Sequence, residues 1–420
     1  MYIQKVTIQN IKNIDYFEMT FTEGQEAGWH VLIGDNGTGK TSIVRSIVIG
    51  HVDGIYVSAL TPKWYGLLQK GKEKAIIYVN TVADEKNTSN GTFTRPERDQ
   101  EVVIELEADM HTSRKFRTYA NKQERETERF PKGYVRFSAA FGPYRRFTDG
   151  NDFWESLEKS TKEALPYITA FNEGVSLKAA INWLVELHNL ERDGYEEGKL
   201  LEPIKMLLNN SKLLPNHVSI YKVDAKGVVL KDANGHEVDL LEMSDGFRSV
   251  LSMTFEVIRL MTVAYSQTKV LEALDTENTQ INLPGVVLID EVDAHLHPTW
   301  QTRIGQWFTR VFPKIQFIVT THSPLICRAA EHGTIWKLAT PGTNEISHEV
   351  TGTAKDRLVY GNVLDAYGTE VFGANVTQSA TGLKKKQRMA DLAKKSFKGV
   401  ITDEERGELE RLRSEMPTAK

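Results

Sequence analysis

Cysteine is nearly absent from this sequence of 420 residues, in which Cys327 is the single one. An internal disulfide framework and a zinc cluster of cysteines are therefore excluded. The sequence also lacks any run of about 18 apolar residues, so it predicts no transmembrane helix. Its start, MYIQKVTIQN, alternates polar and apolar residues like a strand and lacks the layout of a signal peptide. These absences predict a cytoplasmic protein that does not bind a membrane.

A surplus of basic residues is missing too. The formal net charge is −4 and the pI is about 6.3, whereas proteins that bind mainly to the nucleic-acid backbone are usually basic. The charge balance argues against such binding over the whole surface but allows a local basic patch. The content of 40% hydrophobic and 26% charged residues is that of an ordinary soluble globular protein.

Residues 34–41 have the sequence GDNGTGKT and match the phosphate-loop pattern G-x-x-x-x-G-K-[ST]. An apolar strand, 30–33, precedes the loop, and the helical spacing of apolar residues in 43–48 follows it, whereas a simple glycine-rich turn would need neither. Lys40 is expected to reach the β- and γ-phosphates of ATP, and the Thr41 hydroxyl to bind Mg²⁺. The predicted nucleotide-binding residues are Gly34, Asn36, Gly37, Thr38, Gly39, Lys40, Thr41 and Ser42.

A second part of the site follows about 250 residues later, where the apolar run VVLI ends at Asp290 and Glu291. A carboxylate at the end of a buried strand can hold the Mg²⁺ that Thr41 also binds, so Asp290 is the predicted second ligand. Glu291 is the predicted general base for the attacking water. His322, after the next apolar strand, is predicted to contact the γ-phosphate. The alternatives are a surface acidic pair and a structural histidine.

The segment EMSDGFRS opens a long predicted helix, so Ser244, Asp245 and Gly246 form a second potential anion site at a helix N-terminus. One chain has one triphosphate to bind, and its own phosphate loop already holds it. We therefore expect this segment to act in trans, on the nucleotide of another subunit. An ordinary helix cap at Ser244 is the alternative.

The remaining pattern predicts an α/β fold with a mixed core sheet. Residues from about 52 to 135 are predicted to form an antiparallel β-subdomain over the nucleotide, and those from about 152 to 214 an inserted helical lobe. Residues 340–382 are predicted to be irregular. Two helices are expected to end the chain, the second with a capping box of Thr402 and Glu405.

These motifs, in this order, resemble the ABC ATPase superfamily, and more narrowly its RecF, SMC and OLD branch. MSDGFRS is similar to that branch's form of the LSGGQ signature, DEVDAHLHP to its Walker B and D-loop, and TTHSPLI to its switch histidine. The resemblance covers residues 1–335 and implies a P-loop NTPase head, with residues 336–420 as a C-terminal region that docks a partner. It also implies that Lys12, in the opening VTIQNIKNI, contacts the nucleotide.

The sequence departs from the ABC pattern in three places. The stretch FGPYRRF lacks the usual Q-loop glutamine, and the roles of Tyr144, Arg145 and Arg146 stay open between a site and a basic surface turn. His297 replaces the usual D-loop aspartate, so Asp293, His295 and His297 could alternatively form a metal cluster. Neither a Toprim pattern nor a long coiled coil is present, which predicts a stand-alone ATPase without a nuclease site of its own.

Short ATPases of this kind resemble the ATPase subunits of bacterial anti-phage defence systems such as Septu, PARIS and some retrons. The resemblance implies an ATP- and Mg²⁺-dependent homodimer, with ATP between its subunits, that slowly hydrolyses ATP and controls a separate effector, an HNH or Toprim nuclease. One alternative is a RecF-like repair ATPase that binds DNA through Arg145, Arg146 and Lys384–Lys386. A second alternative is the ATPase subunit of a membrane transporter.

Overall fold

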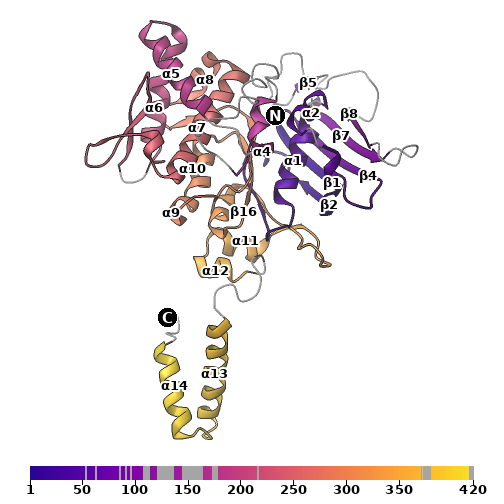
Figure 1. Ribbon diagram of the computed structural model, residues 1–420, viewed down its shortest axis with the longest axis vertical. Helices are drawn as coiled ribbons and strands as arrows, with labels where there is room; N and C mark the ends of the chain where they lie inside the picture. Colours follow the sequence, from indigo (N-terminus) through magenta and orange to yellow (C-terminus); the bar gives the residue numbers. More distant parts are fainter. Residues whose placement is uncertain are drawn as a thin grey trace.

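The protein is described from a computed structural model, which covers residues 1–52, 54–61, 64–84, 87–89, 92–94, 97–106, 114–120, 137–143, 164–172, 178–214, 217–369, 371 and 380–415. Within these residues, a central six-stranded sheet has the order β18-β17-β3-β16-β15-β9. Figure 1 shows β16 at its centre, with helices α7 and α10 on one side and α1, β1 and β4 on the other. The fold is therefore the predicted α/β fold with a mixed core sheet.

The central sheet is parallel except at one edge, where β18 runs antiparallel to β17. Every residue of β3, β9, β15 and β16 is buried. This explains why their sequences are mostly apolar, because a parallel sheet is covered on both faces. The strands are β3 (Gly28–Ile33), β9 (Ser138–Phe141), β15 (Gly285–Ile289), β16 (Ile315–Thr321), β17 (Ile335–Lys337) and β18 (His348–Glu349).

One face of the central sheet packs against helix α1 (Lys40–His51) and an antiparallel sheet of five described strands. Its strands, in the order β2-β1-β4-β7-β8, are β2 (Ile14–Thr20), β1 (Tyr2–Ile11), β4 (Lys74–Val82), β7 (Glu97–Leu106) and β8 (Arg114–Ala120). Strands β4, β7 and β8 lie in the range 52–135 for which antiparallel strands were predicted, although this range begins with two short helices, at Gly54–Leu60 and Trp64–Leu67. The sheet extends beyond that range, because the N-terminal hairpin β1–β2 is part of it.

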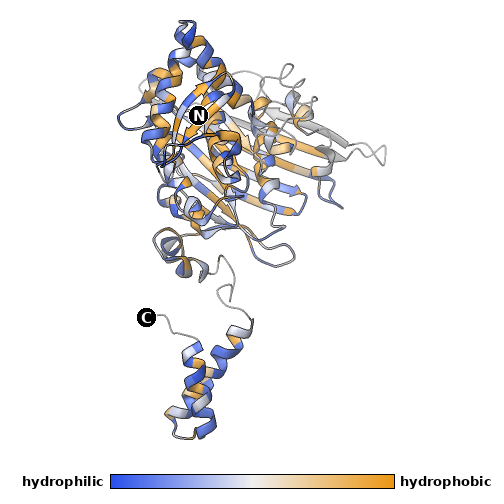
Figure 2. Ribbon diagram, turned by 60° about the vertical axis from the view of Figure 1, so that its left-hand side comes forward, coloured by the Kyte–Doolittle hydropathy of each residue, from blue (hydrophilic) through white to orange (hydrophobic). Residues whose placement is uncertain are grey.

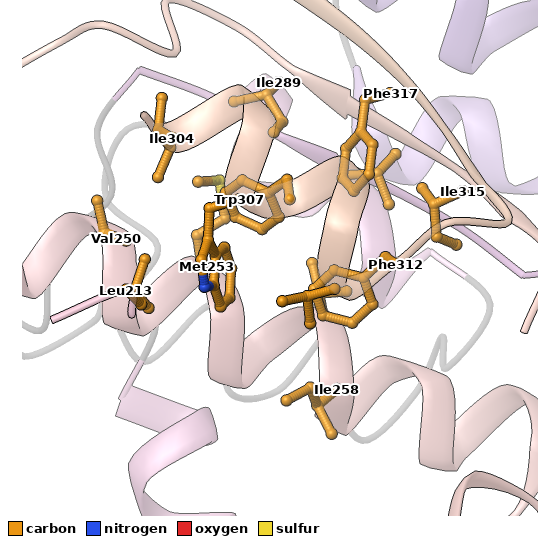
Figure 3. Close-up of a cluster of buried hydrophobic side chains, with 14 of the residues drawn as sticks. Leu213, Val250, Met253, Ile258, Ile289, Ile304, Trp307, Phe312, Ile315 and Phe317 are labelled. Atoms are coloured by element: carbon orange, nitrogen blue, oxygen red, sulfur yellow. The ribbon is translucent and has the colours of Figure 1, made fainter. Parts of the chain in front are cut away.

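The other face packs against helices of a second lobe, and its core is rich in aromatic residues. Trp307, Phe312 and Phe317 meet there with aliphatic residues of α7, as Figure 3 shows. The elements of this lobe are α5 (Lys178–Arg192), α6 (Leu201–Asn210), β10 (Ser219–Asp224), β11 (Gly227–Lys231), β12 (Glu237–Asp239), α7 (Asp245–Tyr265), α8 (Gln267–Ala273) and α10 (Ile304–Val311).

Several short elements connect these layers. They are α2 (Gly54–Leu60), η1 (Trp64–Leu67), β5 (Asn87–Ser89), β6 (Thr92–Thr94), η2 (Leu165–Tyr167), α4 (Ile168–Phe171), η3 (Glu196–Leu200), η4 (Leu240–Glu242), β13 (Leu274–Asp275), β14 (Gln280–Ile281), α9 (Pro298–Gln301) and η5 (Pro324–His332).

The C-terminal region contains more regular structure than the sequence predicted. Residues 340–382 were expected to be irregular, but α11 (Gly352–Val359) and α12 (Val363–Tyr367) form there. The prediction is wrong because Leu358, Val359 and Ala366 are buried against the core, so tertiary packing stabilises these two short helices.

The last two helices, α13 (Ala380–Phe397) and α14 (Asp403–Glu415), pack on each other apart from the sheets (Figure 1). Most of their residues are hydrophilic, whereas hydrophobic residues gather in the sheets and the helices beside them (Figure 2). The predicted capping box is confirmed, because the Glu405 amide donates to Thr402 Oγ1 and the Thr402 amide donates to a Glu405 carboxylate oxygen, each at 3.2 Å.

Candidate nucleotide-binding site

The phosphate loop curls around the ammonium group of its own lysine. Lys40 Nζ donates hydrogen bonds to the carbonyl oxygens of Gly34 at 2.7 Å and Asp35 at 2.9 Å. Gly37 and Gly39 have φ angles of +83° and +94°, which glycine adopts without strain. No side chain caps α1, so its first N–H groups are available to an anion. The loop thus has the donors that a phosphate requires.

The turn between β1 and β2 lies against this loop. The Asn13 side-chain amide donates to the Gly37 carbonyl oxygen. A Cβ atom at Gly39 would come within 2.9 Å of the Ile14 side chain, so close packing also requires glycine here. Lys12 belongs to the same turn. Its pKa is lowered by partial desolvation and then by the positive charge of Arg45. The predicted role of Lys12 in nucleotide binding stays a prediction.

Asp290 and Glu291 follow β15 at its carboxyl end, and one threonine of β16 holds both. Thr320 Oγ1 donates to Asp290 Oδ1 at 2.5 Å and accepts from the Glu291 N–H at 2.7 Å. Glu291 has a φ angle of +47°, in the left-handed region that side chains other than glycine rarely adopt. Strained residues of this kind cluster at functional sites, so this strain fits the predicted catalytic role.

Electrostatic interactions show that the predicted catalytic groups lie together. Burial lowers the pKa of Lys40, while the negative charges of Asp290 and Glu291 act in the opposite direction. Desolvation and then the positive charge of Lys40 lower the pKa of His322, and Asp293 and Glu291 oppose this shift. The chain therefore brings the lysine, the two carboxylates and the histidine into one site from α1, β15 and β16.

Thr41 and Asp290 are the residues that would hold Mg²⁺. Hydroxyl and carboxylate oxygens are the hard ligands that Mg²⁺ prefers, and it commonly takes its other ligands from phosphates and water. Asp290 is 1% exposed and lies at the strand end beside the phosphate loop. The side chains present therefore suit this ion when ATP is bound.

The alternative of a metal cluster after β15 is wrong. In the part of the chain that the structure describes, no three His, Cys, Asp or Glu side chains are placed to hold a metal ion. The three residues have other positions: Asp293 accepts from Thr321 Oγ1 at 2.5 Å, and His297 Nδ1 accepts from the Thr299 N–H at the start of α9. His295 is exposed.

The signature segment, Ser244–Gly246, packs against the loop that follows β15. Ser244 and Asp245 are exposed, and the Ser244 hydroxyl makes no capping hydrogen bond with α7, contrary to the ordinary-cap alternative. A Cβ atom at Gly246 would come within 3.1 Å of the His295 carbonyl oxygen. Asp245 pairs with Arg248, which also donates to the Leu241 carbonyl oxygen at 3.2 Å.

Sequence reasoning missed two residues of the site. Thr320 joins Asp290 to Glu291, and its signal was the pair of threonines that ends an otherwise apolar strand before His322. Asn13 was hidden in the polar turn of the N-terminal hairpin. Tyr144, Arg145 and Arg146 lie outside the described residues, so their roles stay open.

Comparison with known proteins agrees with this geometry. A family model described as "AAA domain, putative AbiEii toxin, Type IV TA system" matches residues 30–328, more than half of the chain. The chain belongs to this family. The match begins in β3 and ends in η5, so it contains the phosphate loop, the signature segment, Asp290, Glu291 and His322. The family and the phosphate loop together make the chain an ATPase of the P-loop type.

Individual relatives of this chain have low sequence identity to it. The Retron Vc95 probable ATPase of Vibrio cholerae serotype O1 biovar El Tor is 28% identical over 51% of this chain. This chain spans 40% of that relative's length. The Septu protein PtuA of Bacillus thuringiensis is 24% identical over 79% of this chain and 74% of its own length. The SMC head domain from Thermotoga maritima aligns with 84% of this chain and 99% of its own length, at a TM-score of 0.44 and 14% identity.

No helix in the described part of the chain combines the length and the apolar content that crossing a bilayer requires.

Of the residues proposed for DNA binding at Lys384–Lys386, Lys385 is engaged within the C-terminal helix pair, and the neighbouring Arg388 is engaged there too. Lys385 pairs with Glu415 at 2.6 Å and Arg388 with Glu408 at 2.8 Å. Pairing of this kind reduces the free positive charge that a phosphate backbone would meet.

Proposed function

We propose that the protein is an ATP-hydrolysing switch that works as a pair of identical subunits. Each ATP is held between the phosphate loop of one subunit and the Ser244–Gly246 segment of the other. The observation that carries the proposal is the exposed start of α7, where the Ser244 hydroxyl makes no capping bond within its own helix. A helix N-terminus with open N–H groups suits the γ-phosphate of a second nucleotide.

Within one site, the residues divide the work. Lys40 leaves the carbonyl oxygens of Gly34 and Asp35 and binds phosphate oxygens instead, which keeps its charge satisfied. Glu291 accepts the proton of the water that attacks the γ-phosphorus. His322 donates a hydrogen bond to the γ-phosphate, and its exposed ring lies near enough to Lys40 and Glu291 for this role. Thr41 and Asp290 would hold Mg²⁺, and the ion would supply neutralisation of phosphate charge.

The energy of ATP binding is proposed to act on a separate protein. The relatives carry names of retron and Septu proteins, which supports a role in anti-phage defence. The effector would be a nuclease of the HNH or Toprim type, and residues 336–420 would dock it. Slow hydrolysis would then separate the subunits and reset the switch.

Replacement of Glu291 by glutamine tests the dimer. The Glu291→Gln chain should bind ATP without completing hydrolysis, and therefore accumulate as a dimer whose mass is measured by light scattering. Lys40→Ala combined with Glu291→Gln is the matched control and should stay monomeric with ATP. A Glu291→Gln chain that binds ATP and remains monomeric would contradict the proposal.

A further inference from the structure

A pocket outside the nucleotide site opens beside α9 and α10. Its volume is about 300 Å³, including space open to solvent. Leu213, Ile304 and Trp307 form its buried apolar floor, and Figure 3 shows these three in one cluster of the core. Lys212 and Arg303 are exposed at its rim. The pocket thus combines an apolar base with two positive charges.

The pocket is held in shape from below. Trp307 Nε1 donates to Ser211 Oγ at 2.9 Å, and Arg310 donates to the Ser211 carbonyl oxygen. These bonds fix the end of α6, and Lys212 follows with a φ angle of +60°. A lysine occupies a position where glycine or asparagine usually follows a helix, and its side chain is directed by that backbone. A pocket built on fixed residues loses little entropy when it is filled.

Its size and charge define the occupant. Pockets for small molecules commonly enclose about 300–1,000 Å³. This pocket is at the lower end of that range, and part of its volume is open to solvent. One or two side chains fit better than a complete small ligand. Within the described residues, neither Lys212 nor Arg303 forms an ion pair, so both cations are available to carboxylates of the occupant.

We propose that this pocket docks a segment of a partner protein in which one aliphatic or aromatic side chain is flanked by acidic residues. The apolar side chain would fill the space above Trp307, and the carboxylates would pair with Lys212 and Arg303. An apolar anchor within a charged rim is the arrangement that carries most binding energy at protein interfaces.

The pocket also contacts the signature segment. Trp300 lines it and meets the Phe247 ring edge-on, with ring centroids 5.4 Å apart and planes at 74°. Phe247 directly follows Gly246. A docked segment would therefore bias the position of the α7 start, and this consequence rests on the proposed function. Docking itself does not, so the two can fail separately.

A labelled peptide tests docking without nucleotide. The probe is a fluorescein-labelled peptide of sequence Asp-Glu-Leu-Phe-Glu-Asp, and fluorescence anisotropy measures its affinity for the full chain. Lys212→Glu and Arg303→Glu should each weaken binding about tenfold, whereas Lys226→Glu, at an exposed lysine in the β10–β11 turn, should not. A peptide with lysine in place of its acidic residues should bind the two rim variants better than the wild-type chain.

Lys212→Gly guards against a folding artefact, because it removes the charge and relieves the left-handed backbone. It should weaken peptide binding while the melting temperature stays equal or rises. Equal affinity of the acidic peptide for the wild-type and Lys212→Glu chains overturns the proposal. So does unchanged peptide binding with loss of the Glu291→Gln dimer in the rim variants, because the pocket would then face a second copy. If Glu291→Gln never dimerises while the rim variants lose the peptide, the proposed function fails and docking stands.

Discussion

Helices α1 and α7 both begin without a side-chain cap, and their surroundings are opposite. The start of α1 is buried, curled around Lys40 and set beside Asp290 and Glu291. The start of α7 is exposed, and Asp245 there pairs with Arg248. The start of α1 therefore lies among the other groups of its own site, whereas the start of α7 faces solvent away from them. This contrast is the physical basis of the proposed pairing of subunits.

The largest effect is expected from a substitution in the phosphate loop at the start of α1. Lys40→Ala removes a buried cation, so ATP affinity should fall by at least about 100-fold. Titration with a fluorescent ATP analogue measures it, with Lys226→Ala as a control that keeps its affinity. Affinity within a few-fold of wild type would mean that phosphates bind elsewhere, and the contrast between the two helix starts would lose its meaning.

Glu291→Gly should separate stability from activity. Relief of the left-handed φ should stabilise the fold by about 0.5 kcal/mol, while loss of the general base lowers the hydrolysis rate by about 100-fold or more. Thr279→Gly is a matched control, because Thr279 also has a positive φ, +56°, in the turn between β13 and β14. It should gain similar stability with unchanged hydrolysis. A destabilised, active Glu291→Gly chain would refute the assignment.

Thr320→Val should have an intermediate effect on the same site. The change keeps the shape but removes the oxygen that joins Asp290 Oδ1 to the Glu291 N–H. A buried N–H without an acceptor costs about 1–3 kcal/mol, and we expect the hydrolysis rate to drop about tenfold as Glu291 loses its position. Thermal melting and steady-state phosphate release measure the two effects. Unchanged values in both would show that the threonine does not hold the carboxylates.

The sequence predicted the surroundings of the start of α1 better than those of the start of α7. A phosphate loop is a local motif, because its glycines, Lys40 and Thr41 are neighbours in the chain. The apolar run of strand β15 likewise predicts a carboxylate at its end, which is Asp290. The contacts of α7 are not local. Gly246 against His295, and Phe247 against Trp300, join residues about 50 positions apart, and no single-sequence pattern encodes such a pairing.

The difference between local patterns and contacts distant in sequence also explains which parts of the fold were predicted. The strands between 52 and 135 have their own alternating pattern, so they were predicted, but their pairing with the N-terminal hairpin depends on contacts distant in sequence. Helices α11 and α12 were missed because each is short and stabilised by packing on the core rather than by its own sequence.

A smaller effect is expected on the stability of the fold at acidic pH. It should come from His30 in β3, the strand that leads into the phosphate loop. Burial lowers the pKa of His30 to about 4 from 6.5. The folded state therefore holds fewer protons than the unfolded state between these values, and stability present above pH 6.5 is lost as the pH falls towards 4. Denaturant unfolding should show a free-energy decline of at most about 3 kcal/mol over this window. His30→Gln should flatten that decline; an equally steep decline would assign it to other groups.

The exposed start of α7 is proposed to complete the nucleotide site of another subunit. A mixture of two inactive variants tests this pairing. Lys40→Ala lacks a working phosphate loop but keeps its signature, and Ser244→Arg blocks the signature but keeps its loop. Each alone should hydrolyse no ATP. A one-to-one mixture should recover about a quarter of the wild-type rate, because half of the pairs contain one intact site. A mixture as inactive as its components, with mixed pairs shown to form by mass, would contradict the account.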